Sequence, residues 1–258
     1  MKLVERLKGL NTSKEKLLQN KDINKVMLDN LKEELQNSGN KKQAELLQRF
    51  FKTGRGEYGD GDIFLGIKVP VQREIVKKYD LKLEDIQDLL NSNIHEYRLS
   101  ALFILIDKYK KSDDNRKKEI YEFYLKNTKK INNWDLVDLS SHKIVGDYLI
   151  NKDRDILYRL ANSENLWEKR ISIISTFAFI KDKDFKDAIK ISEILLKDKH
   201  DLIHKAVGWV LREIGKKDQK TLEDFLKKHY KEMPRTMLRY SIEKFPEEKR
   251  KKYLNGEI

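Results

Sequence analysis

A tryptophan and an aspartate four residues apart form the clearest chemical signal in the sequence. Trp134 and Asp138 lie in the segment 131–138, which has no lysine or arginine although 38% of the chain is charged. In a helix these two positions share one face, about 6 Å apart. An aromatic ring beside a carboxylate suits a ligand that carries or develops positive charge. The spacing therefore predicts one half of a cation site.

Two interpretations of Asp138 remain open. On a continuous helix it projects near Val145 and Leu149, so we expect it to be partly desolvated. Because burial penalises a carboxylate charge, Asp138 needs a positive partner. Either Arg170 neutralises it structurally, or it awaits a cation in the ligand. Asp135 is predicted to be a helix-start acid, favoured by the positive end of the helix dipole.

A second tryptophan lies in a basic stripe on the segment 203–216. At 100° per residue, Trp209 falls about 120° from the centre of the apolar seam of that helix. Lys205, Arg212 and Lys216 are close to it on the same polar face. One interpretation is contact with nucleic acid through the ring and the three cations, which we predict to bind DNA. The other is a half-buried tryptophan under the next repeat.

Arg170 also has two interpretations. It follows Trp167 and flanks an apolar seam formed by Ile171, Ile174 and Ala178. It could bridge neighbouring helical repeats as a structural arginine. Alternatively it could clamp a phosphate, because the guanidinium group matches phosphate geometry with two parallel hydrogen bonds.

These residues belong to a repeat that predicts the fold. Similar segments align on positions 98, 135, 170, 205 and 239, which gives gaps of 37, 35, 35 and 34 residues. A period in this range with two helices per unit is typical of HEAT-like solenoids. We therefore predict an all-α fold, an α-α superhelix of HEAT-like repeats, in a single domain over 1–258. Residues 1–45 would form an N-terminal helical cap, and residues 90–245 hold the clearest repeats.

The charge balance favours a polyanionic partner. The chain has 55 Lys and Arg against 43 Asp and Glu, a formal net charge of +12, which favours nucleic acid first and an anionic membrane surface second. The absence of cysteine excludes disulfides, thiolate metal sites and cysteine nucleophiles. The sequence has no apolar run of about 18 residues. We expect a cytoplasmic monomer that does not bind membranes.

Three weaker motifs predict structure and not chemistry. Gly54, Gly56 and Gly59 satisfy G-x-G-x-x-G, but no strand precedes them and no helix follows, so we expect a structured loop or small hairpin before a helix led by Pro70. The pair His200 and His204 lacks a third metal ligand. We therefore expect no metal and no cofactor. Helix breaks are predicted at 11–13, with a helix start at Ser13, and at 37–40.

Several blocks together resemble the AlkD-like DNA alkylation repair family of HEAT-like-repeat proteins. The resemblance covers roughly residues 40–245, and its blocks occur in the order of the family: Phe50–Gly54, Tyr58–Gly66, Val69-Pro70, Asn133–Asp138, Trp167–Arg170 and Lys205–Glu213.

The resemblance implies a DNA glycosylase that removes positively charged N3- and N7-alkylated purines from duplex DNA. It implies that Trp134, Asp138, Arg170 and Trp209 line the active cleft and that the damaged base is not flipped into a pocket. One carboxylate suffices for this reaction, because the alkylated base is already a good leaving group. Two alternatives remain, a non-catalytic protein that binds branched or distorted DNA and a HEAT-type scaffold for protein interactions. The basic stripe argues against the scaffold.

Overall fold

The structure, a computed structural model, describes residues 25–258 of the 258 in the chain. The chain divides into two compact units, Met1–Lys108 and Tyr109–Ile258. The predicted helix start at Ser13, and most of the predicted cap over 1–45, lie outside the described residues.

The described part of the N-terminal unit is helical apart from its loops. A helix over residues 25–37 is followed by α2 (Lys41–Phe50), α3 (Val69–Val76), α4 (Leu83–Leu90) and α5 (His95–Lys111). The break predicted at 37–40 is confirmed, because Asn40 begins α2 as its N-cap and accepts a hydrogen bond from the amide of Gln43 (2.9 Å). Pro70 stands in the first turn of α3, where a missing amide hydrogen has no cost.

The glycine-rich segment between α2 and α3 is a loop built from turns, as predicted, and it forms no hairpin. Gly56 and Gly61 adopt positive φ angles that other residues rarely tolerate. The carboxylate of Glu96 at the start of α5 holds the end of this loop. It accepts hydrogen bonds from the amides of Leu65 (2.9 Å) and Gly66 (2.8 Å).

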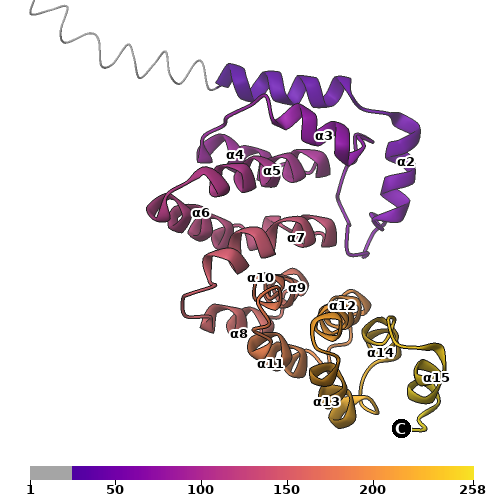
Figure 1. Ribbon diagram of the computed structural model, residues 1–258. Coiled ribbons are helices and arrows are strands. Elements are labelled where there is room, and N and C mark those ends of the chain that lie inside the picture. The colour runs from indigo at the N-terminus through magenta and orange to yellow at the C-terminus, as the bar shows by residue number, and fades with distance from the viewer. Residues whose placement is uncertain (1–24) are drawn as a thin grey trace, which may run out of the picture. The chain divides into compact units, whose positions relative to one another are not determined.

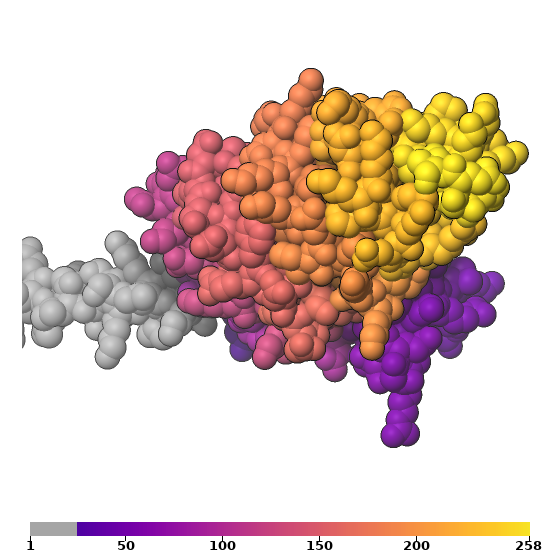
Figure 2. Space-filling view, turned by 90° about the horizontal axis from the view of Figure 1, so that it is seen from below, coloured from indigo at the N-terminus to yellow at the C-terminus, as the bar shows by residue number. Residues whose placement is uncertain are grey.

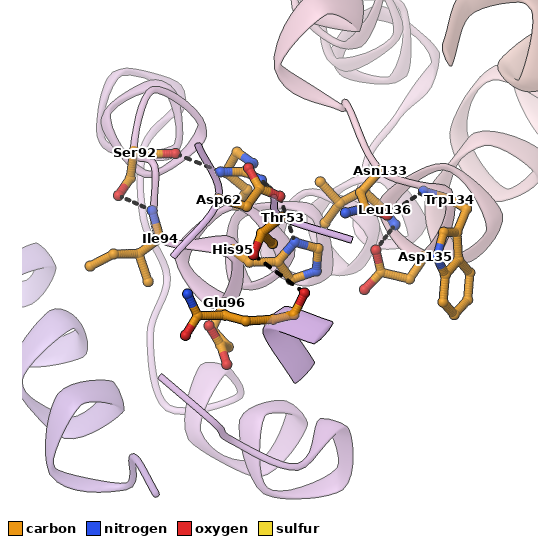
Figure 3. Close-up of polar contacts among 12 residues, drawn as sticks. Thr53, Asp62, Ser92, Ile94, His95, Glu96, Asn133, Trp134, Asp135 and Leu136 are labelled. Carbon is orange, nitrogen blue, oxygen red and sulfur yellow. Dashed lines mark hydrogen bonds and ion pairs between the residues drawn. The ribbon is translucent and has the colours of Figure 1, made fainter. Parts of the chain in front are cut away.

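Asp62, in the second half of this loop, belongs to a buried polar cluster. Its carboxylate accepts a hydrogen bond from Nη2 of Arg98 (2.7 Å), and Nδ1 of His95 lies 3.4 Å away (Figure 3). Burial acts to raise the pKa of Asp62, but the contact with His95 and the charge of Arg98 outweigh it, so the pKa is lowered. The rings of Phe51, Phe64 and His95 pack against one another beside this cluster.

The C-terminal unit is a succession of helices, which Figures 1 and 2 colour from rose through orange to yellow along the chain. They are α6 (Asp114–Lys126), η1 (Thr128–Lys130), α7 (Trp134–Ser141), η2 (His142–Gly146), α8 (Asp155–Ala161), α9 (Leu166–Ser175), α10 (Phe177–Ile180), α11 (Lys186–Ile194), α12 (Asp201–Lys217), α13 (Gln219–His229), α14 (Arg235–Ser241) and α15 (Glu247–Asn255).

The predicted repeat positions fall on equivalent helices. Positions 135, 170, 205 and 239 lie on α7, α9, α12 and α14, and position 98 lies on α5 in the N-terminal unit. Across residues 25–258 the structure contains no strand, only an isolated bridge between Ile63 and Ile94. The all-α class is thus confirmed.

The predicted apolar seams form the core. The seam residues of α12 are fully buried: Ile203, Ala206, Val207, Val210, Leu211 and Ile214. Gly208 lets α14 approach α12 closely, because a Cβ at this position would lie 2.5 Å from Cβ of Tyr240 and 2.6 Å from the carbonyl oxygen of Met237. Position 208 therefore sets the spacing between these two helices.

Candidate active site

Helix α7 carries the tryptophan and aspartate that the sequence singled out. Asn133 is its N-cap, and the side chain of Asn133 accepts a hydrogen bond from the amide of Trp134 (2.8 Å). Asp135 lies in the first turn, as predicted, and its carboxylate accepts from the amide of Leu136 (2.8 Å) (Figure 3). These contacts begin the helix at Trp134, so Asp138 stands one turn further along it.

Asp138 and Arg170 form an ion pair with two parallel hydrogen bonds. Arg170 donates from Nε to Oδ1 of Asp138 (2.8 Å) and from Nη2 to Oδ2 (2.7 Å). The side chain of Arg170 keeps 6% of its surface exposed and that of Asp138 keeps 14%. The carboxylate is therefore the more accessible partner. Of the two interpretations, the structure shows Arg170 neutralising Asp138.

The pKa of Asp138 is raised above its ordinary value. Burial is the main cause, and the charge of Asp135 adds to it, while the charge and hydrogen bonds of Arg170 oppose the shift. Arg170 thus limits an electrostatic cost that burial imposes on the carboxylate. A ligand that brings positive charge would relieve the same cost.

Arg170 also ties together three helices, α7, α9 and α12, that carry successive repeat positions. Nη1 of Arg170 donates to the carbonyl oxygen of Leu202 on α12 (2.5 Å), while its other nitrogens hold Asp138 on α7. Three of its five N–H groups are used in this way. Arg170 therefore bridges neighbouring repeats, which was one of its two predicted roles, and two N–H groups remain for any phosphate.

The start of α9, which carries Arg170, is fixed by its own polar contacts. Asn165 caps the helix and accepts from the amide of Trp167 (2.8 Å). Glu168 then accepts hydrogen bonds from Thr128 on η1 (2.7 Å) and from Ser163 (2.5 Å). These bonds fix where α9 begins and so where Arg170 meets Asp138.

A π-helical turn, η2, directly follows α7 and interrupts the regular helix. Turns of this type insert one extra residue and often lie at functional sites. The projection of Asp138 onto Val145 and Leu149 assumed a continuous α-helix and does not hold across η2. Gly146 ends the turn against α9, since a Cβ there would lie 2.2 Å from the carbonyl oxygen of Ser175.

A row of rings links η2 to Trp209. His142 on η2 lies edge-on to Phe177 on α10, with ring centroids 6.4 Å apart, and Phe177 lies 4.7 Å from the ring of Trp209. Burial and the charge of Lys143 lower the pKa of His142 to about 4, so it is neutral at physiological pH. The sequence pattern does not predict a place at the site for His142 or Phe177, although His142 stands at helical spacing from Asp138.

The four residues implied for the active cleft are placed as follows. Asp138 and Arg170 are in direct contact, and Trp134 begins the helix that carries Asp138. Trp209 lies on α12, is half-buried, and contacts the ring row through Phe177. The residue is half-buried, as one interpretation predicted, but its ring contact is with α10, which precedes α12, and contact with nucleic acid stays a prediction.

The cations of the predicted basic stripe are each paired with an acid. Lys205 lies 2.7 Å from Asp201, Lys216 lies 2.7 Å from Glu213, and Arg212 forms ion pairs with Glu213 and Glu243. Their charges are partly cancelled before any ligand binds. The sequence predicted the cations but not this pairing.

The two histidines of the i, i+4 pair have structural contacts. His200 caps α12 by accepting from the amide of Leu202 (3.1 Å), and Nε2 of His204 lies 2.6 Å from the carbonyl oxygen of Asp198. Among residues 25–258 no group of three or more His, Asp or Glu is arranged to hold a metal ion. No helix in this same range is long and apolar enough to cross a membrane.

Comparisons with known proteins identify the class. Residues 31–245 match the family described as DNA alkylation repair enzyme, so the chain belongs to this family. A search of curated proteins gives no match.

Two solved structures are similar in fold. One is a predicted DNA alkylation repair enzyme from Enterococcus faecalis, with a TM-score of 0.66 and 17% identity, over 81% of this chain and 98% of that one. The other is AlkD2 from Streptococcus mutans, with a TM-score of 0.51 and 19% identity, over 80% and 99%. At these identities the likeness shows the fold, and it confirms the predicted class of HEAT-like helical repeats.

Proposed function

We propose that this protein is a DNA glycosylase that hydrolyses the N-glycosidic bond of N3- and N7-alkylated purines in duplex DNA. The observation that carries the proposal is the Asp138–Arg170 pair on α7 and α9, in which the Asp138 side chain has a raised pKa and keeps 14% of its surface exposed. Membership in the DNA alkylation repair enzyme family supports a repair role.

The proposed reaction needs stabilisation of positive charge more than proton transfer. The C1′–N bond breaks and its electron pair moves to the purine, which neutralises the cationic base. Positive charge then develops on the sugar, and a water molecule adds at C1′ and loses a proton. Asp138 would stabilise the charge on the sugar and orient this water. No general acid is required, because the base leaves as a neutral molecule.

Arg170 is proposed to act mainly as a positioning residue. Both carboxylate oxygens of Asp138 accept from its guanidinium, which fixes the plane of the carboxylate. The two remaining N–H groups of Arg170 would contact a phosphate next to the lesion. Trp134 and Trp209 would pack against the deoxyribose and present ring faces to the cation.

A site of this kind would not require the damaged base to leave the helix. Apart from the ring faces presented to the cation, the proposed contacts are with the sugar and the backbone, so the lesion would be recognised by its charge while it stays stacked. This distinguishes the proposal from enzymes that flip a base into a pocket.

Release of 7-methylguanine from methylated duplex DNA tests the proposal. The intact chain should release the base, and Asp138→Asn should reduce the single-turnover rate by roughly 100-fold or more, as expected for loss of one preorganised electrostatic group. Asp187→Asn is a matched control, because Asp187 also pairs with an arginine, Arg154 (2.6 Å), but lies away from the predicted site residues in sequence. It should retain the rate.

One observation favours an alternative, non-catalytic binding of branched or distorted DNA. Arg170 already satisfies both oxygens of Asp138, so the pair could serve as a structural bridge. The alternative predicts tight DNA binding with no base release. Equal release by the intact chain and Asp138→Asn would remove Asp138 from the mechanism.

A further inference from the structure

The repeat position of Arg170 is occupied by Arg239 in the last repeat. The two arginines differ in whether an acid is paired with the side chain. At this position Arg98 pairs with Asp62 (2.7 Å), Arg170 pairs with Asp138 (2.7 Å) and Lys205 pairs with Asp201 (2.7 Å), while the repeat at position 135 holds an acid, Asp135. Arg239 on α14 is the next member of the series. Its side chain makes no hydrogen bond or ion pair within residues 25–258. The series therefore ends in a cation without an acid.

Arg239 lines a cavity of about 360 Å³ formed by α12, α14 and α15. Lys205 contributes from α12 and Arg250 from α15, so three cations line one cavity. The floor between α12 and α14 depends on Gly208, where a Cβ would meet Tyr240. The cavity is thus set by the same close helix packing that forms the core.

The acids that also line the cavity are already engaged. Asp201 pairs with Lys205, and Glu243 pairs with Arg212 and with Lys244 (3.0 Å). The pKa of each of these two carboxyls is lowered by its hydrogen-bond partners, although burial opposes this, so both stay ionised near neutral pH. The lining of the cavity thus holds one more cation than acids, and neither Arg239 nor Arg250 forms an ion pair with a described residue.

Arg250 gives a second, independent observation on the polar groups of the cavity. Its Nε atom is buried and has no hydrogen-bond partner among the described residues. A buried donor without an acceptor costs about 1–3 kcal/mol. An anion with several acceptor oxygens would satisfy this donor and the free guanidinium of Arg239 together.

We propose that this cavity binds a phosphodiester group of the DNA backbone, away from the lesion. The proposal rests on the proposed function for the choice of DNA as the anion. It adds a backbone anchor in the last repeat that involves none of the four proposed active-site residues. Backbone anchors of this kind fix the register of a protein on the duplex without reading its sequence.

The salt dependence of binding tests the proposal. Binding of a short, undamaged, fluorescein-labelled duplex is measured by anisotropy over a range of salt concentrations. Each phosphate contact contributes about 0.9 to the slope of log affinity against log salt. The double variant Arg239→Ala/Arg250→Ala should lower the slope by about 1 and weaken binding roughly tenfold at low salt. Its helical content and melting temperature are recorded to show that it folds.

Two matched variants make the result specific. Lys227→Ala/Lys228→Ala removes the same two charges from exposed positions on α13 and should leave the slope nearly unchanged. Arg239→Lys/Arg250→Lys keeps both charges and should restore the slope, while affinity stays reduced because lysine cannot bind a phosphate with two parallel bonds. An unchanged slope in the alanine variant, or an equal fall in the α13 variant, overturns the proposal.

The same measurements separate this proposal from the proposed function. If the intact chain releases 7-methylguanine and the alanine variant keeps the original slope, only the phosphate site is wrong. If the chain binds duplex DNA through this site without releasing a base, the glycosylase proposal is wrong and the phosphate site stands.

Discussion

Two aspartates, one in each unit, meet arginine in different ways, and their pKa values move in opposite directions. Asp62 contacts both Arg98 and His95, and its pKa is lowered. Within residues 25–258 Asp138 pairs with one cation, Arg170, while the charge of Asp135 acts against it, and its pKa is raised. The fold stabilises the charge of Asp62, whereas it opposes the charge of Asp138. A carboxylate whose negative charge is opposed by burial gains more from a ligand that brings positive charge.

The largest effect on stability is expected from Asp62→Asn. This substitution removes the charge that Arg98 and His95 compensate and leaves a buried guanidinium without its counterion. Breaking a buried ion pair from one side costs about 3–5 kcal/mol. Urea unfolding should show a loss of about that size, with base release per folded molecule unchanged. A loss below about 1 kcal/mol would contradict a structural role for the Asp62 cluster.

Asp138→Asn should give the converse result. Removing a carboxylate of raised pKa also removes the cost of burying its charge, so the loss of stability should be smaller than for Asp62→Asn. Base release should nevertheless fall by roughly 100-fold. Unfolding and single-turnover kinetics on the same preparations check both parts. If Asp138→Asn were the more destabilising change, the contrast between the two aspartates would be wrong.

The pH dependence of stability should have opposite signs at the two residues. The pKa of Asp62 is lower in the folded state, so its contribution is complete above the ordinary value of about 3.9 and is lost as the pH falls through the folded pKa. The pKa of Asp138 is higher in the folded state, so its ionisation costs stability above that pKa and the cost disappears on acidification. Urea titrations from neutral to acid pH, with each Asn variant, separate the two contributions.

Base release should lose activity on the acid side at a pH above that expected for an ordinary aspartate. The proposed reaction needs Asp138 ionised, and burial raises its pKa. His142, with a pKa near 4, remains neutral over most of this range and should not contribute. The single-turnover rate, corrected for spontaneous base loss, gives the profile. An acid limb that stays in place in His142→Gln, with that variant active, would exclude histidine as its source.

The smallest effect is expected from Trp209→Leu. The ring of Trp209 is held by Phe177, and it would contribute a single aromatic contact to a cationic substrate, worth about 0.5–2 kcal/mol. Base release should fall roughly 3- to 30-fold, with little change in binding to undamaged duplex. Trp209→Phe retains an aromatic face and should restore most of the rate. An equal loss in both variants would indicate that the size of the indole matters and not its face.

The sequence predicts the parts of this protein that depend on local patterns. The seam of α12 follows helical spacing and is buried as predicted, and the acid at Asp135 lies in the first turn of its helix. Trp134 and Asp138 are one turn apart, which fixes their common helix. Such features depend on residues within a few positions of one another, so periodicity alone determines them.

What the sequence does not predict depends on distant partners. Glu243 pairs with Arg212 from 31 positions away, and Asp62 is buried against Arg98, which lies 36 positions further along the chain. Phe177 contacts Trp209 across two helices. The π-helical turn at His142–Gly146 has no local signature either, because the close contact of Gly146 with Ser175 arises only when η2 packs on α9.

That π-helical turn has an evolutionary consequence. Deleting any one codon within His142–Gly146 would leave enough residues for an ordinary α-helix over the same rise. The turn itself accommodates the extra residue, so the helical segments before and after it would keep nearly the same relative rotation. Asp138 would still face Arg170, and the change would be confined to the turn that carries His142. A lineage could thus reshape the ring row beside the ion pair through a single in-frame deletion and keep the pair itself.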